Sequence, residues 1–155
     1  MDRIVTVPRI VFIIIIIAII ILIAVFAVTN IKAKANDTRR LSNIGTIQEV
    51  LFDINKETND FTRSGCLSDS FVSGCVGDNL FSQKLPFTGI LSDPASTDSI
   101  LKCSQTCQSD IACDYSFKTV EKDNYELHFR LQKGVAGFDA GCFILTPTGI
   151  IPIEK

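Results

Sequence analysis

A run of apolar residues near the amino terminus constrains this chain more than any other feature. From Ile10 to Val28 the sequence contains only Ile, Val, Leu, Phe and Ala. A helix of this length covers roughly 28 Å, at about 1.5 Å per residue, and the hydrocarbon core of a bilayer is about 30 Å thick. A single segment satisfies all its backbone polar groups in lipid only as a helix. The run therefore predicts a transmembrane helix over residues 10–28, after a tail of residues 1–9.

Two other readings of this run are weaker. A domain of this size could not cover such a segment on all sides, which argues against a buried core helix. A cleaved signal peptide would use Arg3 and Arg9 as its basic region and Val25-Phe26-Ala27 as its cleavage site. The apolar part of a cleaved signal usually spans about 7 to 15 residues, so the longer run favours a retained anchor and a retained amino end.

Charge divides the chain into a basic amino-terminal part, residues 1–40, and an acidic remainder. The 155 residues carry a net charge of -2. The first forty hold six Lys+Arg against two Asp, and the rest hold nine Lys+Arg against fifteen Asp+Glu, which gives +4 and -6. Nucleic-acid binding depends on neutralising phosphates, so the acidic body argues against a nucleic-acid partner. The length leaves room for one modest domain.

The orientation of the body is set by two opposing signals. Four basic residues follow the apolar run and two precede it, which by the positive-inside rule places the body in the cytoplasm. Six cysteines in a small domain point instead to an oxidising compartment. We give the cysteines more weight. We therefore expect a single-pass anchor in the cytoplasmic membrane with an extracytoplasmic body, which could be exposed at the cell surface. The membrane-flanking basic residues are Arg9, Lys32, Lys34, Arg39 and Arg40.

Residues 29–60 are predicted to form a helical stem. Apolar side chains recur there every three or four residues, which is the pattern of an amphipathic helix that faces a core. The stem should end near Asn59, and Thr29 and Asn30 are its weakest point. Arg39 and Arg40 are expected on its solvated face near anionic headgroups, with a specific docking role as the alternative. The stripe consists of Leu41, Ile44, Ile47, Leu51, Ile54, Thr58 and Phe61.

Residues 61–155 are predicted to form a globular body with the packed stem face. Cys66–Ser96 is rich in turn residues and predicts a loop. Three aromatics in it, Phe71, Phe81 and Phe87, are expected to fasten that loop to the core. A short helix is predicted over Thr97–Cys107, capped by Thr97.

The last third of the chain changes to a period of two. Alternating residues predict strands over 115–119 and 125–131, joined as a hairpin with one buried face, and a third strand over 142–146 that closes against Pro147. Three strands packed on the stem helix give an α+β fold with a small antiparallel sheet.

The six cysteines are read as a disulfide framework, because small bodies with irregular loops need such bridges. Six cysteines allow fifteen pairings, and the spacing does not choose among them. Zinc is the weaker alternative, since the cluster lacks paired C-x-x-C knuckles, and the missing C-x-x-C also disfavours thiol redox catalysis. At least two disulfides are expected. The candidates are Cys66, Cys75, Cys103, Cys107, Cys113 and Cys142.

No constellation in the sequence predicts catalysis or a metal site. His128 alternates with Glu126 and Arg130 and is expected on the exposed face of its strand, without a nucleophile tied to it by spacing. Asp69, Asp78 and Asp93 are loop acids that could contribute to calcium binding, but no EF-hand pattern is present, so solvated acids are favoured. The chain is therefore expected to be non-enzymatic and to need no cofactor.

The stem sequence resembles that of bacterial type IV pilins and pseudopilins. The matching residues run from Ala33-Lys34-Ala35 through Asp37 and Arg39-Arg40-Leu41 to Ile44 and Ile47-Gln48, and the loop from Leu85-Pro86 to Ser92-Asp93-Pro94 is similar to the family's proline-marked stretch. The order of membrane helix, amphipathic helix, loop and small sheet covers nearly the whole chain. The family's Gly-Phe cleavage site and the Glu within its apolar helix are missing here, and Arg9 stands where that Glu would lie.

The resemblance implies a structural role. We expect a pilin-like or pseudopilin-like subunit, or an accessory component of a pilus or secretion apparatus, that contacts the lipid bilayer and other pilin-like subunits through its amino-terminal helix. The alternative is a membrane-tethered extracytoplasmic binding module or adhesin, whose ligand the sequence does not name.

Overall fold

The computed structural model describes residues 6–75, 79–85, 91–95, 101–107 and 111–153, with side chains from Val11 onward. The chain divides into two compact units, residues 1–33 and 34–155. Helix α1 (Thr6–Thr58) contributes to both units, and each unit is described here by itself.

The part of α1 in the second unit packs along the body by one apolar stripe. Ile44, Ile47, Leu51 and Ile54 are completely buried in the core. Between Leu41 and Thr58, most of the other side chains are polar and more exposed, with Phe52 as an exposed apolar exception, which confirms the amphipathic stem. The helix ends at Thr58, and Asn59 adopts a left-handed backbone with φ 54°, so the predicted end is confirmed as well.

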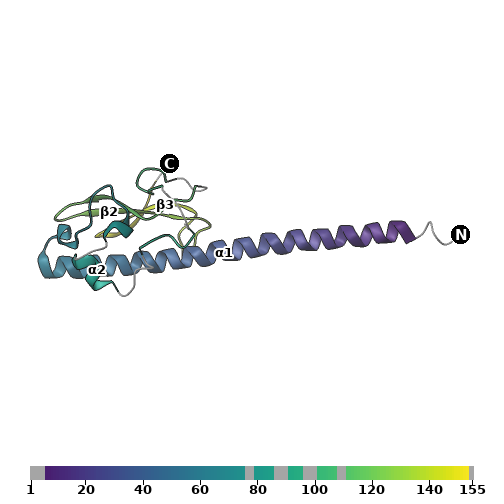
Figure 1. The fold of residues 1–155 in the computed structure, drawn as a ribbon, viewed down its shortest axis with the longest axis horizontal. Helices are drawn as coiled ribbons and strands as arrows, with labels where there is room; N and C mark the ends of the chain where they lie inside the picture. The colour runs from purple at the N-terminus through teal and green to yellow at the C-terminus, as the bar shows by residue number, and fades with distance from the viewer. Residues whose placement is uncertain (1–5, 76–78, 86–90, 96–100, 108–110, 154–155) are drawn as a thin grey trace. The chain divides into compact units, whose positions relative to one another are not determined.

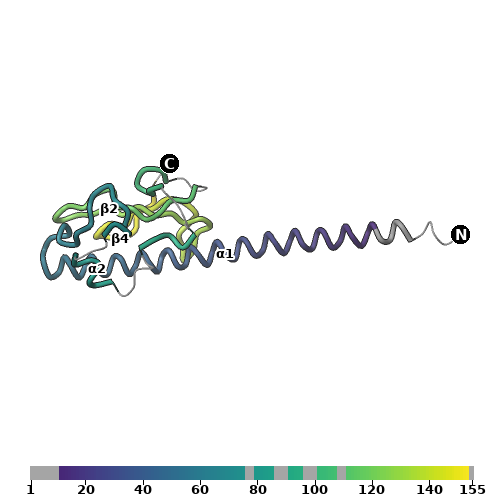
Figure 2. Tube along the Cα trace, in the orientation of Figure 1, coloured from purple at the N-terminus to yellow at the C-terminus, as the bar shows by residue number. Residues whose placement is uncertain are grey.

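The sheet has four antiparallel strands in the order β1-β2-β3-β4. They are β1 (Ser116–Val120), β2 (Tyr125–Leu131), β3 (Gly141–Thr146) and β4 (Gly149–Pro152). Figures 1 and 2 show this layer beside the carboxyl-terminal half of α1. The α+β fold is confirmed. The predicted count of three strands is wrong, because the chain turns at Pro147-Thr148 and returns to pair with β3.

One face of the sheet completes the core with the stem. Phe61 contacts the ring of Tyr125 edge-on at 4.9 Å, and Phe129 stacks on Phe143 at 5.5 Å. Alternate residues of β2 point into this core, as the period of two predicts. The buried residues of the sheet and the preceding loop on this side are Tyr115, Phe117, Tyr125, Leu127, Phe129, Leu131, Phe143 and Leu145.

The opposite face of the sheet is covered by a loop, contrary to the prediction of a single buried face. The loop formed by residues 101–107 and 111–114 is attached to the sheet at several points: the backbone N–H of Ser104 donates to Oγ of Ser116 in β1, at 2.8 Å. Ser116 and Arg130, both on this face, are consequently buried. Residues 101–107 form a bridge and a turn rather than the predicted helix; residues 96–100 lie outside the described part of the chain.

The predicted loop, where the structure describes it (residues 66–75, 79–85 and 91–95), contains short helical turns. These are η2 (Val72–Cys75) and α2 (Leu80–Lys84), and η1 (Phe61–Ser64) precedes them. Phe81 is completely buried and Phe71 half-buried, so both fasten this loop to the body as predicted, and Phe87 lies outside the described residues.

Replacing Gly45 with alanine should stabilise the body. Gly45 is exposed within α1, and a Cβ built there meets nothing within 4 Å. Since glycine costs about 0.5–1 kcal/mol relative to alanine inside a helix, Gly45→Ala should raise the free energy of unfolding by that amount.

The matched control is Gly134→Ala. Gly134 has φ +81°, and its Cβ would lie 2.4 Å from the backbone oxygen of Phe138, so this substitution should destabilise the body. Denaturant unfolding of the full chain in nanodiscs measures both variants. A loss of stability for Gly45→Ala would contradict the exposed position of this helix face.

Candidate functional site

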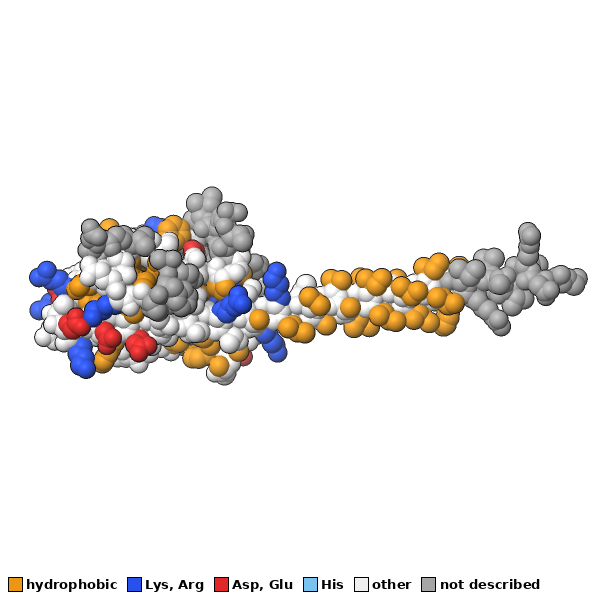
Figure 3. Space-filling view, turned by 60° about the horizontal axis from the view of Figure 1, so that its bottom comes forward, with side chains coloured by type: hydrophobic (Ala, Val, Ile, Leu, Met, Phe, Trp, Pro, Cys, Tyr) orange, Lys and Arg blue, Asp and Glu red, His pale blue; other side chains and the backbone are white. Residues whose placement is uncertain are grey.

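The apolar part of α1 exposes its side chains along its whole described length. Exposure of the large apolar residues from Val11 to Val28 ranges from 41% to 69%. Hydrophobic side chains cover the visible face of this segment (Figure 3). Among the described residues this is the one helix long and apolar enough to cross a membrane by length and composition. Soluble proteins rarely expose so continuous an apolar surface, so this segment needs a covering of lipid or protein.

The basic residues after the apolar segment do not share one environment. Lys32, Lys34 and Arg39 are exposed, as expected of residues near headgroups. Arg40 is completely buried, so the prediction that it lies on the solvated face is wrong. The side chain of Arg9 lies outside the described residues.

Arg40 is buried because two carboxylates surround it. Its Nη1 donates to Asp37 at 2.5 Å, one helical turn away, and its Nε and Nη2 donate to both oxygens of Asp93, at 2.6 and 2.7 Å. Burial lowers the pKa of Arg40, but the hydrogen bonds and charges of Asp93 and Asp37 outweigh burial and raise the pKa overall. The prediction of Asp93 as a solvated loop acid is therefore also wrong. Asp69 is exposed, and Asp78 lies outside the described part of the chain.

Asp37 joins the stem to the turn after β2. Its carboxylate accepts the backbone N–H groups of Gln132, Lys133 and Gly134 at 2.9, 2.7 and 3.0 Å. Four donors, counting Arg40, thus converge on one buried carboxylate, which is how a buried charge is normally satisfied.

Asp114 extends this network from the other side. Its carboxylate accepts the N–H of Asp93 at 2.7 Å and of Tyr115 at 2.8 Å. The pKa of Asp114 is raised overall. Burial is the main cause, the two backbone hydrogen bonds lower the pKa, and the charge of Asp93 raises it further. Asp93, at the end of the proline-marked stretch, is thereby bonded to both the stem and the segment before β1.

All six cysteines form disulfides in the structure. The bonds are Cys66–Cys75, Cys103–Cys113 and Cys107–Cys142. The first closes a loop beside η2, the second closes the loop on the outer face of the sheet, and the third ties that loop to β3. The expectation of at least two disulfides is confirmed.

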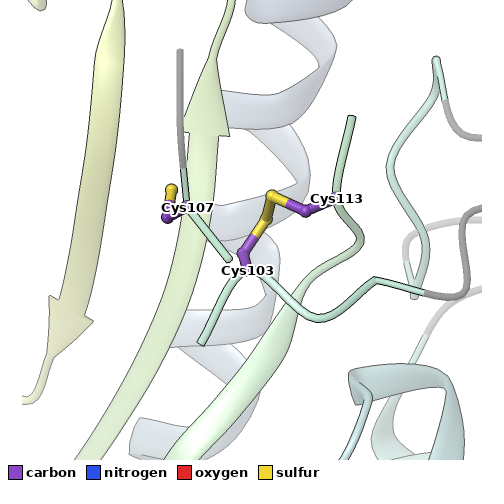
Figure 4. A group of neighbouring side chains, drawn as sticks. All are labelled: Cys103, Cys107 and Cys113. Carbon is purple, nitrogen blue, oxygen red and sulfur yellow. A yellow bond between two sulfur atoms is a disulfide. The ribbon is translucent and has the colours of Figure 1, made fainter. Parts of the chain in front are cut away.

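Three of these sulfurs belong to one cluster. The Sγ atoms of Cys103, Cys107 and Cys113 lie within 4.8 Å of one another. Figure 4 shows the three side chains in front of the strands, with a helix behind them. Because each sulfur is bonded to another sulfur, the cluster does not present the thiolates that bind zinc.

A cavity of about 510 Å³ lies beside the third disulfide. Its wall comprises the β2–β3 loop, the end of β4 and the disulfide itself. The lining residues include Cys107, Phe138, Cys142, Phe143, Pro152 and Ile153.

His128 is not exposed as predicted, since its side chain is only 12% accessible. It lies on the outer face of the sheet, opposite Ser116 of β1, whose hydroxyl is bonded to the loop residue Ser104. Burial lowers the pKa of His128, while the carboxylate of Glu126, 4.0 Å from Nε2, opposes that shift and Lys118 adds to it. The folded protein therefore favours the neutral imidazole.

Acid should destabilise the body in part through His128. The unfolded chain binds this proton with a pKa near 6.5 and the folded chain binds it more weakly, so stability present above about pH 6.5 is lost as the pH falls below that value. In His128→Gln, the fall in Tm between about pH 7.5 and about pH 5 should be smaller than in the unchanged protein. Equal falls in both proteins would contradict a shielded, neutral His128.

The carboxylate network was not predicted from sequence. The spacing of Asp37 and Arg40 by three residues is a usable signal for an ion pair on one helix face. Asp93 and the turn at 132–134 are 53 and more than 90 residues away, and no local pattern links them to the stem.

No protein family, curated protein or solved structure that was compared matches this sequence. The architecture of a long amino-terminal apolar helix followed by a four-stranded antiparallel sheet is consistent with pilin-like folds.

Proposed function

We propose that this protein is a membrane-anchored, pilin-like structural subunit without catalytic activity, with its body outside the cytoplasmic membrane. The observation that carries this proposal is the two-part helix α1. Its first part exposes apolar side chains along its whole described length, and its second part buries one stripe against a sheet. A helix of this kind anchors a body in lipid by one end and serves as the backbone of the body by the other.

The three disulfides support an extracytoplasmic body, because such bonds persist in oxidising compartments. A reporter that is active only in the cytoplasm, fused after Lys155, should therefore stay silent. Activity of that reporter would contradict the proposed orientation. A peptide containing Arg9 should be recovered from the membrane-bound protein if the anchor is retained.

Assembly through the apolar helix separates this function from its alternative. We would introduce a photo-crosslinking residue at Ile20, in the exposed apolar segment, and reconstitute the full chain in lipid bilayers. Adducts of two or more copies are expected. The matched control carries the crosslinker at Lys122, in the exposed turn between β1 and β2, and should give few such adducts.

The alternative is a membrane-tethered binding module, which the cavity beside Cys107 and Cys142 favours. If the crosslinker at Ile20 yields only monomers and lipid adducts, assembly between copies of this chain is contradicted. The binding module is then the favoured function.

A further inference from the structure

The two disulfides on the outer face of the sheet differ in accessibility. Cys103 and Cys113 are buried, with 1% and 0% exposure. Cys107 and Cys142 are partly exposed, and both line the cavity of about 510 Å³. A thiol from outside therefore meets Cys107–Cys142 first, because thiol–disulfide exchange depends on access to a sulfur atom.

The accessible disulfide also has a sulfur next to the buried one. Sγ of Cys107 lies within 4.8 Å of Sγ of both Cys103 and Cys113. Cys107 lies on the loop, whereas Cys142 is held in β3 by pairing with Arg130. Once the bond between them opens, Cys107 is the thiol that belongs to the cluster.

We propose that Cys107–Cys142 is the reactive bond of a thiol–disulfide exchange site: an external dithiol reduces it, and the released Cys107 thiolate then exchanges with the buried Cys103–Cys113 bond. The proposal is independent of the function proposed above. It requires a disulfide pair at the cavity and a neighbouring pair within reach of the released sulfur, and both are present.

The exchange balances in two stages. A dithiol attacks Cys142, Cys107 leaves as the thiolate, and the second thiol of the dithiol resolves the mixed disulfide, so the dithiol is oxidised and Cys107 and Cys142 are reduced by two electrons. The Cys107 thiolate then attacks Cys103 or Cys113, a new bond to Cys107 forms, the Cys103–Cys113 bond breaks, and the expelled thiolate takes up a proton. The protein keeps two thiols throughout the second stage.

The test treats the full chain in nanodiscs with one equivalent of dithiothreitol, followed by acid quenching, alkylation and peptide mapping. Peptides that join Cys107 to Cys103 or Cys113 are expected, with alkylated Cys142. The Cys66–Cys75 bond, which is outside the cluster, is the internal control and should remain intact. Alkylation of Cys107 and Cys142 alone, with Cys103–Cys113 unchanged, would overturn the proposal, and so would earlier reduction of Cys66–Cys75.

Two variants separate exchange from simple opening. In Cys107→Ser, reduction of Cys103–Cys113 by the dithiol should slow by about tenfold or more, because access to a buried bond limits its rate. In Cys142→Ser, Cys107 has no original partner and should be found bonded to Cys103 or Cys113 without any reductant. A Cys142→Ser protein with Cys107 wholly alkylated would overturn the proposal even if Cys107→Ser fails to fold.

Discussion

Replacing Arg40 with methionine should lower the free energy of unfolding of the body by about 3–5 kcal/mol. Removal of one partner from a buried ion pair leaves the other charge uncompensated, and here two buried carboxylates, Asp37 and Asp93, would lose their common cation. For a body of this size, a loss of that order corresponds to a fall of about 10 °C or more in Tm. Thermal unfolding of the full chain in nanodiscs measures it.

The control for this substitution is the adjacent residue. Arg39→Met removes the same charge from an exposed position and should change stability by no more than about 0.5 kcal/mol. The double variant Arg40→Met with Asp93→Asn should recover part of the loss, because only one of the two carboxylates, Asp37, then remains without its cation. Equal stability of Arg40→Met and Arg39→Met would contradict the carboxylate network.

Three aspartates in the apolar segment should release the protein from the bilayer, whereas one should not. Sixteen of the nineteen residues from Ile10 to Val28 are Ile, Leu, Val or Phe. On the scale of membrane insertion, each contributes about -0.3 to -0.6 kcal/mol, roughly -5 to -10 kcal/mol together, and a central Asp costs about 2.5–3.5 kcal/mol. One Asp therefore leaves insertion favourable, and three offset the whole contribution.

The experiment compares Ile20→Asp with the triple variant that carries Asp at Ile16, Ile20 and Ile23. The single variant should float with liposomes and resist alkaline extraction, and the triple variant should do neither. A triple variant with Leu at the same positions is the control and should behave like the unchanged protein. Flotation of the triple Asp variant would remove the support for a membrane-spanning anchor.

Sequence periodicity predicted those elements whose partners lie close along the chain. The stem stripe of Ile44, Ile47, Leu51 and Ile54 and the alternation in β2 each express a local geometry, the 3.6-residue turn or the two-residue pleat. Both gave the correct buried face of the core without any knowledge of what covers that face.

β4 was missed for a local reason. Pro147 and Gly149 are signals that end a strand, and the four residues that follow the turn are too few to show an alternation. The same turn residues permit a tight hairpin, and the pairing of Ile150 with Leu145 makes Gly149–Pro152 a strand. A strand of this length is recognised only from its neighbour.

The environments of Arg40 and His128 were missed because they depend on distant contacts. A basic residue at the edge of an apolar stripe has the pattern of a solvated side chain until Asp93 is placed against it. His128 alternates as an exposed residue would, but the Cys107–Cys142 bond brings a loop over its strand face. Fifteen pairings were open to the cysteines, so no inference from spacing could place that cover.

The hydrogen bonds of Asp37 imply an order of events during synthesis. The backbone groups that its carboxylate accepts belong to residues 132–134, which a ribosome adds almost one hundred residues after Asp37 itself. The apolar segment, in contrast, is complete by Val28 and can enter the bilayer while most of the chain is still unmade. In the anchored protein proposed above, the apolar segment is therefore placed in the bilayer before the body can close, and Asp37 acquires its backbone partners only after the turn that follows β2 has been synthesised.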